Sequence, residues 1–333
     1  MINGKKIAVV IPMYNPGNLV LRVLEAIPAE VDLVVVVDDG STDGSPGLVA
    51  GFQDPRIRLV AMERNSGVGA ATLRGMEAAA ALGAEVLVKV DADDQMDPRR
   101  VPLLVRPIVC GRADCAKGNR FFHVDELEQM PLVRRVGNMA LSFVCKAATG
   151  YWDIFDPTNG FLALHARVFE LLNKRRIAHD YFFEISLLAE LGLHRCVVRD
   201  VPIPARYPHE VSHLSVWRAL FRFPRRLLAL LLRRIWLHHF VQDFGMMAVS
   251  LVMGTSLCLV GAVFGISHWL RSAQLGIVTP TGTVMLAVLP LVFGFQLLLQ
   301  ALYLDIQSVP RVPVHPEVGE EEQGSTEKNA SAP

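Results

Sequence analysis

Short apolar runs alternate with helical patterns through residues 6–120. The runs at 7–11 and 33–37 are continuously apolar and rich in Val and Ile, whereas 17–27 and 67–83 have the spacing or the Ala content of helices. Continuous apolar runs are typical of parallel strands that are covered by helices on both faces. The pattern therefore predicts an α/β domain with a mostly parallel sheet, whose ligands bind beyond the carboxyl ends of the strands.

Acidic residues stand where two of the predicted strands end. Asp91 and Asp93 follow one Val-rich run, and Asp38 and Asp39 follow another. Two carboxylates at D-x-D spacing can hold one hard divalent cation, Mg²⁺ or Mn²⁺, and leave positions for a diphosphate. Asp38 and Asp39 could accept hydrogen bonds from ribose hydroxyls or from a base N–H. Taken alone, each acidic segment could equally be a solvated turn or a helix cap.

A Gly-rich segment precedes the Ala-rich helical pattern. Gly67 and Gly69 would let the backbone approach a ligand, and they open a helix whose N-terminus suits a phosphate. Such a loop is ambiguous by itself, and its meaning depends on the motifs around it.

From Ser215 to Phe240 the chain becomes cationic and amphipathic. A cationic amphipathic helix that carries Trp is typical of a segment lying on anionic lipid, and a solvated helix docked on the globular domain is the alternative. Apolar residues fill another face of the predicted helix, which Pro224 interrupts. The arginines recur at helical spacing and are Arg218, Arg222, Arg225, Arg226, Arg233 and Arg234.

Two long segments near the C-terminus, residues 244–267 and 272–304, contain no charged residue. Each is long enough to cross the hydrocarbon layer, which takes about 20 apolar residues. We expect spans near 245–266 and 283–304, with two buried core helices as the alternative. Because the arginines precede the first span, the positive-inside rule predicts that both termini are cytosolic.

Composition agrees with a membrane protein. Hydrophobic residues make up 51% of the chain, and the mean hydropathy is +0.33. The formal net charge is zero, so bulk charge gives no reason to expect nucleic acid as a partner. The five cysteines lack zinc-ligand spacing, and we expect free thiols. The predicted organisation is an N-terminal α/β domain (1–212), juxtamembrane helices (213–243), two spans (244–306) and a disordered acidic tail (307–333).

Four motifs give the N-terminal half a family resemblance. "VVIPMYN", "VVDDGSTDGS", "RNSGVGAA" and "VDADDQMDP" occur in that order, and together they resemble glycosyltransferase family 2 with its GT-A fold. The resemblance covers roughly the first 210 residues. It implies that Asp91 and Asp93 bind the metal ion. It also implies that the nucleotide sugar is bound by Pro12, Tyr14, Asn15, Asp38, Asp39, Gly67, Asp91 and Gln95.

The following segments narrow the resemblance to polyprenyl-phosphate sugar transferases. These segments are "GNRFF", "MPLVRRVGN", "DPTNGFLAL", "YFFEISLLAEL" and "ARYPHEVSHLS", followed by the two spans. By that likeness Arg120, Arg134 and Arg206 hold the acceptor phosphate. An arginine suits this task because its fork binds phosphate at two points and keeps its charge. The chain has "HEVSH" where the family usually has "GESK", so His213 replaces a lysine.

The expected reaction follows from the acceptor. A phosphate monoester has a second pKa near ~6 and is already nucleophilic at neutral pH. One direct displacement by this phosphate would invert the anomeric centre. No general base is required, and Asp93 or Glu184 is the fallback if one exists. The expected partners are a nucleotide diphosphate sugar, a polyprenyl phosphate and a membrane, which we expect to be the cell inner membrane; a homo-oligomer stays open.

Three other functions predict different sequence features. A transferase of the same fold that builds polysaccharide on a saccharide acceptor usually carries a Q-x-x-R-W motif, which is missing from the sequence. A non-catalytic membrane adaptor would have lost the acidic residues at the nucleotide site, and these are present. A nucleotidyltransferase would need a Gly-rich N-terminal loop with a basic residue, which the sequence also lacks.

Overall fold

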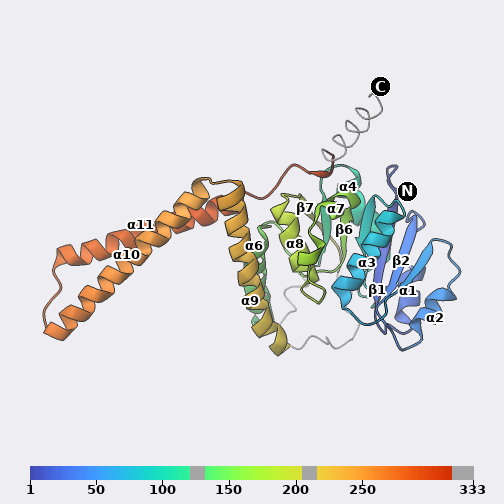
Figure 1. Ribbon diagram of the computed structural model, residues 1–333, viewed down its shortest axis with the longest axis horizontal. Coiled ribbons are helices and arrows are strands. Elements are labelled where there is room, and N and C mark those ends of the chain that lie inside the picture. Colours follow the sequence, from blue (N-terminus) through green and yellow to red (C-terminus); the bar gives the residue numbers. More distant parts are fainter. Residues whose placement is uncertain (121–131, 205–215, 317–333) are drawn as a thin grey trace, which may run out of the picture. The chain divides into compact units, whose positions relative to one another are not determined.

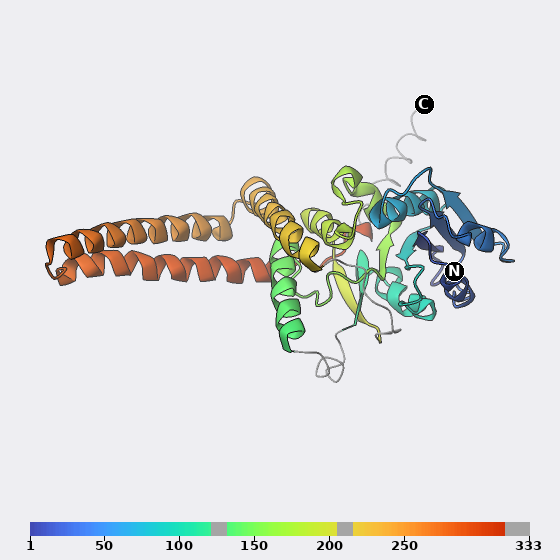
Figure 2. The same cartoon turned by 90° about the horizontal axis from the view of Figure 1, so that it is seen from below.

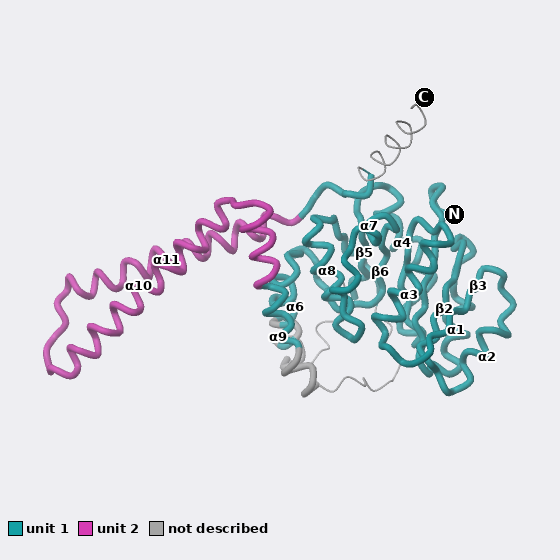
Figure 3. The backbone as a smooth tube through the Cα atoms, in the orientation of Figure 1, with its two compact units in different colours: residues 1–231, 310–333 teal, residues 232–309 magenta. Residues whose placement is uncertain are grey.

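The computed structural model describes residues 1–120, 132–204 and 216–316. The chain forms two compact units, coloured separately in Figure 3. The first comprises residues 1–231 together with the described residues from Pro310 onward, and the second comprises residues 232–309. The division into four regions that the sequence predicts, at 1–212, 213–243, 244–306 and 307–333, stays a prediction.

A seven-stranded sheet forms the centre of the first unit (Figure 1), with the order β3-β2-β1-β4-β6-β5-β7. Neighbouring strands are parallel except where β6 pairs with β4 and with β5. The predicted α/β class with a mostly parallel sheet is therefore confirmed. The strands are β1 (Ile7–Met13), β2 (Leu33–Asp38), β3 (Ile57–Ala61), β4 (Val86–Lys89), β5 (Cys115–Asn119), β6 (Leu162–His165) and β7 (Val198–Pro202).

Helices cover both faces of the sheet. On one face, buried residues of α1 and α4, such as Val23 and Leu104, pack with alternate residues of the central strands, such as Val9 and Val36. On the other face α3 crosses the strands. The helices of this unit are α1 (Leu19–Glu25), α2 (Ser45–Ala50), α3 (Val68–Ala81), η1 (Pro98–Arg100), α4 (Val101–Val109), α6 (Leu132–Thr149), α7 (Ala166–Leu171), η2 (Lys174–Arg176) and α8 (Phe183–Leu193).

The close approach of α3 depends on Gly75. A Cβ atom at this position would overlap the side chain of Val10 and come within 2.8 Å of Cγ2 of Val37. Glycine therefore lets the helix lie directly on β1 and β2. This contact fixes the start of α3, and with it the Gly-rich loop, beside the carboxyl ends of those strands.

The segment after the last helix returns to the first unit. The backbone N–H of His315 donates to Oδ1 of Asp114 at 2.8 Å, and the imidazole Nδ1 lies 2.9 Å from the same oxygen. The ring of His315 also stacks on that of His165, with 4.4 Å between the ring centroids. Asp114 is completely buried, so these contacts anchor the segment firmly to the rest of the first unit.

The second unit is a hairpin of two long helices, α10 (Met246–Leu275) and α11 (Thr281–Gln307), which lie side by side in Figures 1 and 2. Both are long and apolar enough to cross a membrane, as the sequence predicts. They approach closely at small residues, since a Cβ at Gly254 would lie 2.9 Å from the carbonyl oxygen of Gly294. Two further helices, α9 (Val216–Arg234) and the π-helix η3 (Ile235–Gln242), precede the hairpin.

A buried ion pair stabilises the base of this hairpin. Arg234 donates from Nη1 and Nη2 to the two carboxylate oxygens of Asp305, at 2.7 and 2.9 Å. Nε2 of His239 lies 2.9 Å from Oδ1 of Asp305. One predicted lipid-facing arginine, Arg234, is therefore buried and holds the end of α11.

Candidate active site

The candidate site lies at the carboxyl edge of the sheet. Because β1, β2 and β4 are parallel neighbours, their ends meet at this edge. Asn15 follows β1, Asp38 ends β2 with Asp39 after it, and Asp91 and Asp93 follow β4. The structure thus brings together the acidic residues that the sequence singled out.

Asp39 is bound to the Gly-rich loop. It is 2% exposed, and its two oxygens accept hydrogen bonds from the backbone N–H groups of Ser66 at 2.7 Å and Gly67 at 2.8 Å. The amide of Gly69, the second residue of α3, donates to the carbonyl oxygen of His179 at 2.8 Å. The amides that we expected to approach a phosphate therefore bind protein oxygens. Gly67 and Asp39 act here as one structural unit that sets the shape of the loop.

The loops after β1 and β2 are tied together by Asn15. Its side-chain oxygen accepts from the N–H of Thr42 at 2.7 Å, and its own N–H donates to Oγ of Ser41 at 3.0 Å. Oδ1 of Asp38 accepts from the N–H of Ser41 at 2.9 Å. Asn15 has a φ of +50°, which asparagine tolerates better than most residues. Asn15, which is predicted to bind the nucleotide, therefore also has a structural role, because it joins the two loops.

The two N-terminal residues predicted to bind the nucleotide differ in exposure. Pro12 is buried inside β1, where it pairs with Val37 of β2. Tyr14 is 52% exposed at the edge of the sheet, so its ring can reach a ligand. Of the two, only Tyr14 presents its side chain to solvent.

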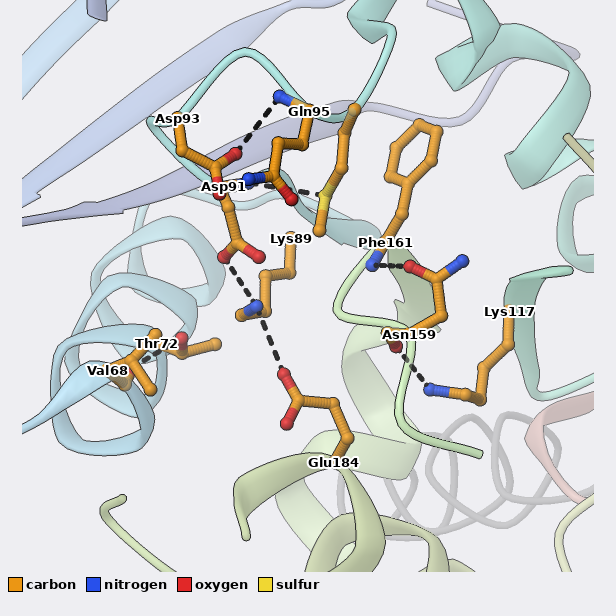
Figure 4. Close-up of polar contacts among 11 residues, drawn as sticks. Val68, Thr72, Lys89, Asp91, Asp93, Gln95, Lys117, Asn159, Phe161 and Glu184 are labelled. Carbon is orange, nitrogen blue, oxygen red and sulfur yellow. Dashed lines mark hydrogen bonds and ion pairs between the residues drawn. The ribbon is translucent and has the colours of Figure 1, made fainter. Parts of the chain in front are cut away.

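Asp91 and Asp93 lie close together on the loop after β4, with the Asp91 carboxylate turned toward Lys89 (Figure 4). Oδ1 of Asp93 accepts from the backbone N–H of Gln95 at 3.1 Å, and the side chain of Gln95 is exposed. Burial and the neighbouring Asp91 carboxylate raise the pKa of Asp93. Oδ1 of Asp91 is bound at 2.6 Å by the ammonium of Lys89, a residue of β4 that the sequence analysis missed.

Lys89 is held from two sides. Its Nζ is 2.6 Å from Asp91 and 3.2 Å from Oε1 of Glu184 on α8. Burial disfavours its charge, but the two carboxylates more than compensate and raise the pKa of Lys89 above its ordinary value. The sequence did contain a signal for these ion pairs. A lysine inside a Val-rich strand is expected to be buried, and a buried lysine needs carboxylate partners.

A second buried lysine lies near Glu184. Nζ of Lys117 on β5 donates to the carbonyl oxygen of Asn159 at 2.6 Å, and burial lowers the pKa of Lys117. The side-chain amide of Asn159 donates to the carbonyl oxygen of Gly118 at 2.7 Å. These bonds hold the segment before β6 against β5, near Glu184.

Arg120 follows β5 and is oriented by Asp156. Its Nε and Nη2 donate to the two oxygens of Asp156, at 2.8 and 3.2 Å, and the Asp156 carboxylate is completely buried. The Arg120 side chain keeps an exposed fraction of 38%. Of the three arginines predicted to hold the acceptor phosphate, only Arg120 has a described side chain. Arg206 lies outside the described residues, as does the side chain of Arg134.

A polar pair stands beside this arginine. The amide of Asn119 donates to Oδ2 of Asp200 at 3.0 Å, and the N–H of Phe155 donates to the same oxygen at 2.8 Å. Burial raises the pKa of Asp200 to about 6. Its other oxygen, Oδ1, is buried and has no hydrogen-bond partner among the residues that the structure describes.

The chain is similar to known proteins over its first unit. The profile of the family described as glycosyl transferase family 2 matches residues 8–172. Polyprenol monophosphomannose synthase of Mycolicibacterium smegmatis is 31% identical over 203 residues, which are 59% of this chain and 75% of the relative. UDP-N-acetylglucosamine–dolichyl-phosphate N-acetylglucosaminyltransferase of Methanococcus voltae is 27% identical over 218 residues, 61% of this chain and 86% of the relative. Succinoglycan biosynthesis protein ExoO of Rhizobium meliloti is 36% identical over 225 residues, 63% of this chain and 62% of the relative.

The sheet topology and the acidic carboxyl edge define a glycosyltransferase of GT-A fold. The chain belongs to glycosyl transferase family 2.

Proposed function

We propose that this enzyme transfers a sugar from a nucleotide diphosphate, UDP or GDP, to a polyprenyl phosphate of undecaprenyl or dolichyl type. One juxtaposition carries the proposal. Because β4 and β5 are both antiparallel to β6, they run in the same direction, so Asp91 and Arg120 lie at the same sheet edge. A carboxylate site suits a cation-bound diphosphate, and an oriented guanidinium suits a second phosphate. The names of the relatives from M. voltae and M. smegmatis, with dolichyl-phosphate and polyprenol in them, agree with this acceptor.

Asp91 and Asp93 would hold the divalent cation, Mg²⁺ or Mn²⁺. The described residues contain no group of three or more His, Cys, Asp or Glu side chains that could hold a metal ion. Two adjacent carboxylates still fit, because Mg²⁺ takes few protein ligands and completes its shell with phosphate oxygens and water. When bound, the cation would neutralise charge on the departing diphosphate. Gln95, next to this pair, would contact the diphosphate.

The nucleoside would bind above the ends of β1 and β2. Tyr14 offers an exposed ring, and Asp38, which is 7% exposed and accepts from Ser41 at Oδ1, would turn its other oxygen to a ribose hydroxyl. Pro12 and Asn15 would shape this pocket through the strand and loop contacts described above. Asp39 would act through Gly67, because its two oxygens hold the loop that borders the pocket.

The acceptor phosphate would meet Arg120, with Arg134 and Arg206 completing its site. Held by Asp156, Arg120 would place one phosphate oxygen behind the anomeric carbon. The bond from this oxygen to carbon forms as the bond from carbon to the diphosphate breaks, so the anomeric centre is inverted. The phosphate is already ionised at neutral pH, and the reaction needs no base from Asp93 or Glu184.

The reaction would take place at the cytosolic face of the cell inner membrane. Two apolar helices would anchor the catalytic domain, and α9 would lie along the lipid surface. His315, beyond α11, is bonded to Asp114 of the catalytic domain. An even number of spans must therefore separate these residues, which supports two spans with the catalytic domain and the segment after α11 on the same side of the membrane.

A second candidate function keeps the same donor but uses a saccharide acceptor. The similarity to succinoglycan biosynthesis protein ExoO favours it. The two are separated by incubating purified protein in lipid with a panel of labelled nucleotide sugars and either polyprenyl phosphate or oligosaccharides. Our proposal expects label in the lipid extract, dependent on Mg²⁺ or Mn²⁺. Label only in the oligosaccharide would favour the alternative, and full activity in excess chelator would refute the metal role.

A further inference from the structure

The ammonium of Lys89 lies between two carboxylates of different exposure. The Lys89 side chain is 1% exposed, that of Glu184 is 10% exposed, and that of Asp91 is 26% exposed. Figure 4 shows the three in a row, with Asp91 on the side of Asp93 and Glu184 on the side of α8. Asp91, the more exposed of the two carboxylates, is therefore the one that we assign to the metal ion.

Gly160 leaves the space that this row needs. A Cβ atom there would lie 2.5 Å from Nζ of Lys89 and 2.7 Å from Oδ2 of Asp91. Any side chain would thus press on the ammonium and on the second carboxylate oxygen. The backbone of Gly160 instead covers both groups closely, so that water is kept from Lys89.

A cation at Asp91 and the ammonium of Lys89 would compete for one carboxylate. Two positive charges on neighbouring oxygens repel each other strongly where water is excluded. Lys89 cannot turn to solvent, because it is buried. Glu184, already at 3.2 Å, is the anion to which the ammonium can move.

We propose that Lys89 and Glu184 form a counter-ion switch for Asp91: Lys89 neutralises Asp91 when no divalent cation is bound, and Glu184 takes over the ammonium when the cation binds. This inference rests on the proposed metal role of Asp91 and Asp93. Lys89 and Glu184 are positioning residues in it, since both act through Asp91. The switch keeps the empty site from carrying two uncompensated carboxylates and sets how tightly the cation is held.

Two single variants follow with opposite signs. Lys89→Met removes the competitor and should tighten Mn²⁺ binding about tenfold. Glu184→Gln leaves the ammonium with Asp91 as its only carboxylate, so that Mn²⁺ binding should weaken about fivefold. The double variant Lys89→Met/Glu184→Gln has no ammonium to be moved. Its affinity should match that of Lys89→Met within about twofold, because the effect of Glu184 passes through Lys89.

The experiment is a Mn²⁺ titration of the full-length protein in detergent, read by the electron paramagnetic resonance signal of free Mn²⁺. Asp91→Asn gives the background of unspecific binding. Lys117→Met is the matched control, because Lys117 is an equally buried lysine that bonds to Asn159. It should leave the dissociation constant within about twofold of that of the unchanged protein. Melting temperatures of all variants show which of them are folded. If a single variant is not, the double variant carries the test: it leaves only the partly exposed Asp91 carboxylate without its lysine, and it should bind Mn²⁺ about tenfold more tightly than the unchanged protein.

The outcomes distinguish a failure of the proposed switch from a failure of the proposed metal role. If Glu184→Gln weakens Mn²⁺ binding by the same factor with and without Lys89, Glu184 acts by its own field and the switch is wrong. Unchanged affinity in Lys89→Met would also overturn the switch while leaving the metal role intact. If neither the unchanged protein nor Lys89→Met binds Mn²⁺ above the Asp91→Asn background, the metal role itself fails.

Discussion

Arg226 on α9 forms a bifurcated ion pair with Asp180: one guanidinium nitrogen, Nη1, lies 2.9 and 2.7 Å from the two carboxylate oxygens. The guanidinium carbon also lies 4.9 Å from the centre of the Phe182 ring. Arg225, next to it in sequence, is exposed. Of these two neighbouring arginines on the cationic helix, Arg226 is therefore bound to the catalytic domain, whereas Arg225 is exposed at the surface.

This difference predicts distinct effects of the two arginines. Arg225→Gln should weaken the dependence of activity on anionic lipid, because one cation near the surface contributes about 1 kcal/mol to docking. Arg226→Gln should instead lower the melting temperature, because it breaks the contact with Asp180. Steady-state kinetics of the protein reconstituted in vesicles with several fractions of anionic lipid, together with melting curves in detergent, measures both. Equal losses of this lipid dependence in the two variants would contradict the assignment.

Arg120 should act on the acceptor and not on the donor. Arg120→Gln is expected to raise the KM for polyprenyl phosphate or lower kcat, with the KM for the nucleotide sugar little changed. Asp156→Asn should act in the same direction more weakly, because it leaves Arg120 in place but poorly oriented. Steady-state kinetics with both substrates titrated provides the measurement. If Arg120→Gln or Arg206→Ala changed only the donor KM, that arginine would belong to the nucleotide diphosphate.

The buried pair of His165 and His315 predicts a pH-dependent stability. Burial, followed by the charges of His315, Lys5 and Arg167, lowers the pKa of His165 to about 4, and Glu85 opposes this shift. Between about pH 6.5 and pH 4 the unfolded chain therefore binds a proton that the folded chain excludes. The contribution is complete above pH 6.5 and is lost as the pH falls to 4, by about 3 kcal/mol.

The measurement compares melting temperatures across this range for His165→Asn and the unchanged protein. Asparagine can still cap α7, as the His165 side chain does by accepting from the N–H of Arg167 at 3.3 Å. The variant should show a flatter pH dependence. His194→Asn, at an exposed position, should keep the original slope. A slope that persists in His165→Asn would contradict the account.

Membrane topology can be tested with the native thiol of Cys110 as a reference. Cys110 is exposed on the catalytic domain, so that it should react with an impermeant reagent only from the cytosolic side. In a Cys110→Ser background, a cysteine at Ser272 should be labelled from outside and one at Gln323 from the same side as Cys110. Labelling of the Ser272 and Gln323 positions from one side would refute the two spans.

The strands, the acidic edge and the spans could be predicted from the sequence because each depends on local pattern. The run at 33–37 contains no polar residue, which indicates a strand covered on both faces of the sheet. The two aspartates directly after this Val-rich run indicate a binding site at the end of the strand. The antiparallel insertion of β6 was not predicted, since "LALH" carries no sign of its direction.

The contacts inside the site depend on tertiary neighbours. Lys89 and Glu184 are 95 positions apart, and nothing local tells that they meet. Asp39 and Gly67 each stood in a recognised motif, but their mutual hydrogen bond changes the role of the loop amides from phosphate ligands to a structural support. Chemical classes of site residues follow from sequence, whereas the partner of each residue comes from the fold.

The central claim is that a nucleotide-linked sugar is joined to a lipid phosphate at the Asp91 and Asp93 edge. Mass spectrometry of the lipid extract tests it most directly, after full-length protein in bilayers has been given polyprenyl phosphate, nucleotide sugar and Mg²⁺. The account predicts a product heavier than the acceptor by one sugar residue and carrying a single phosphate. Asp91→Asn and Asp93→Asn, with unchanged melting temperatures, should form none of it. A product that carries a diphosphate, or equal product from the Asp91→Asn variant, would contradict the account.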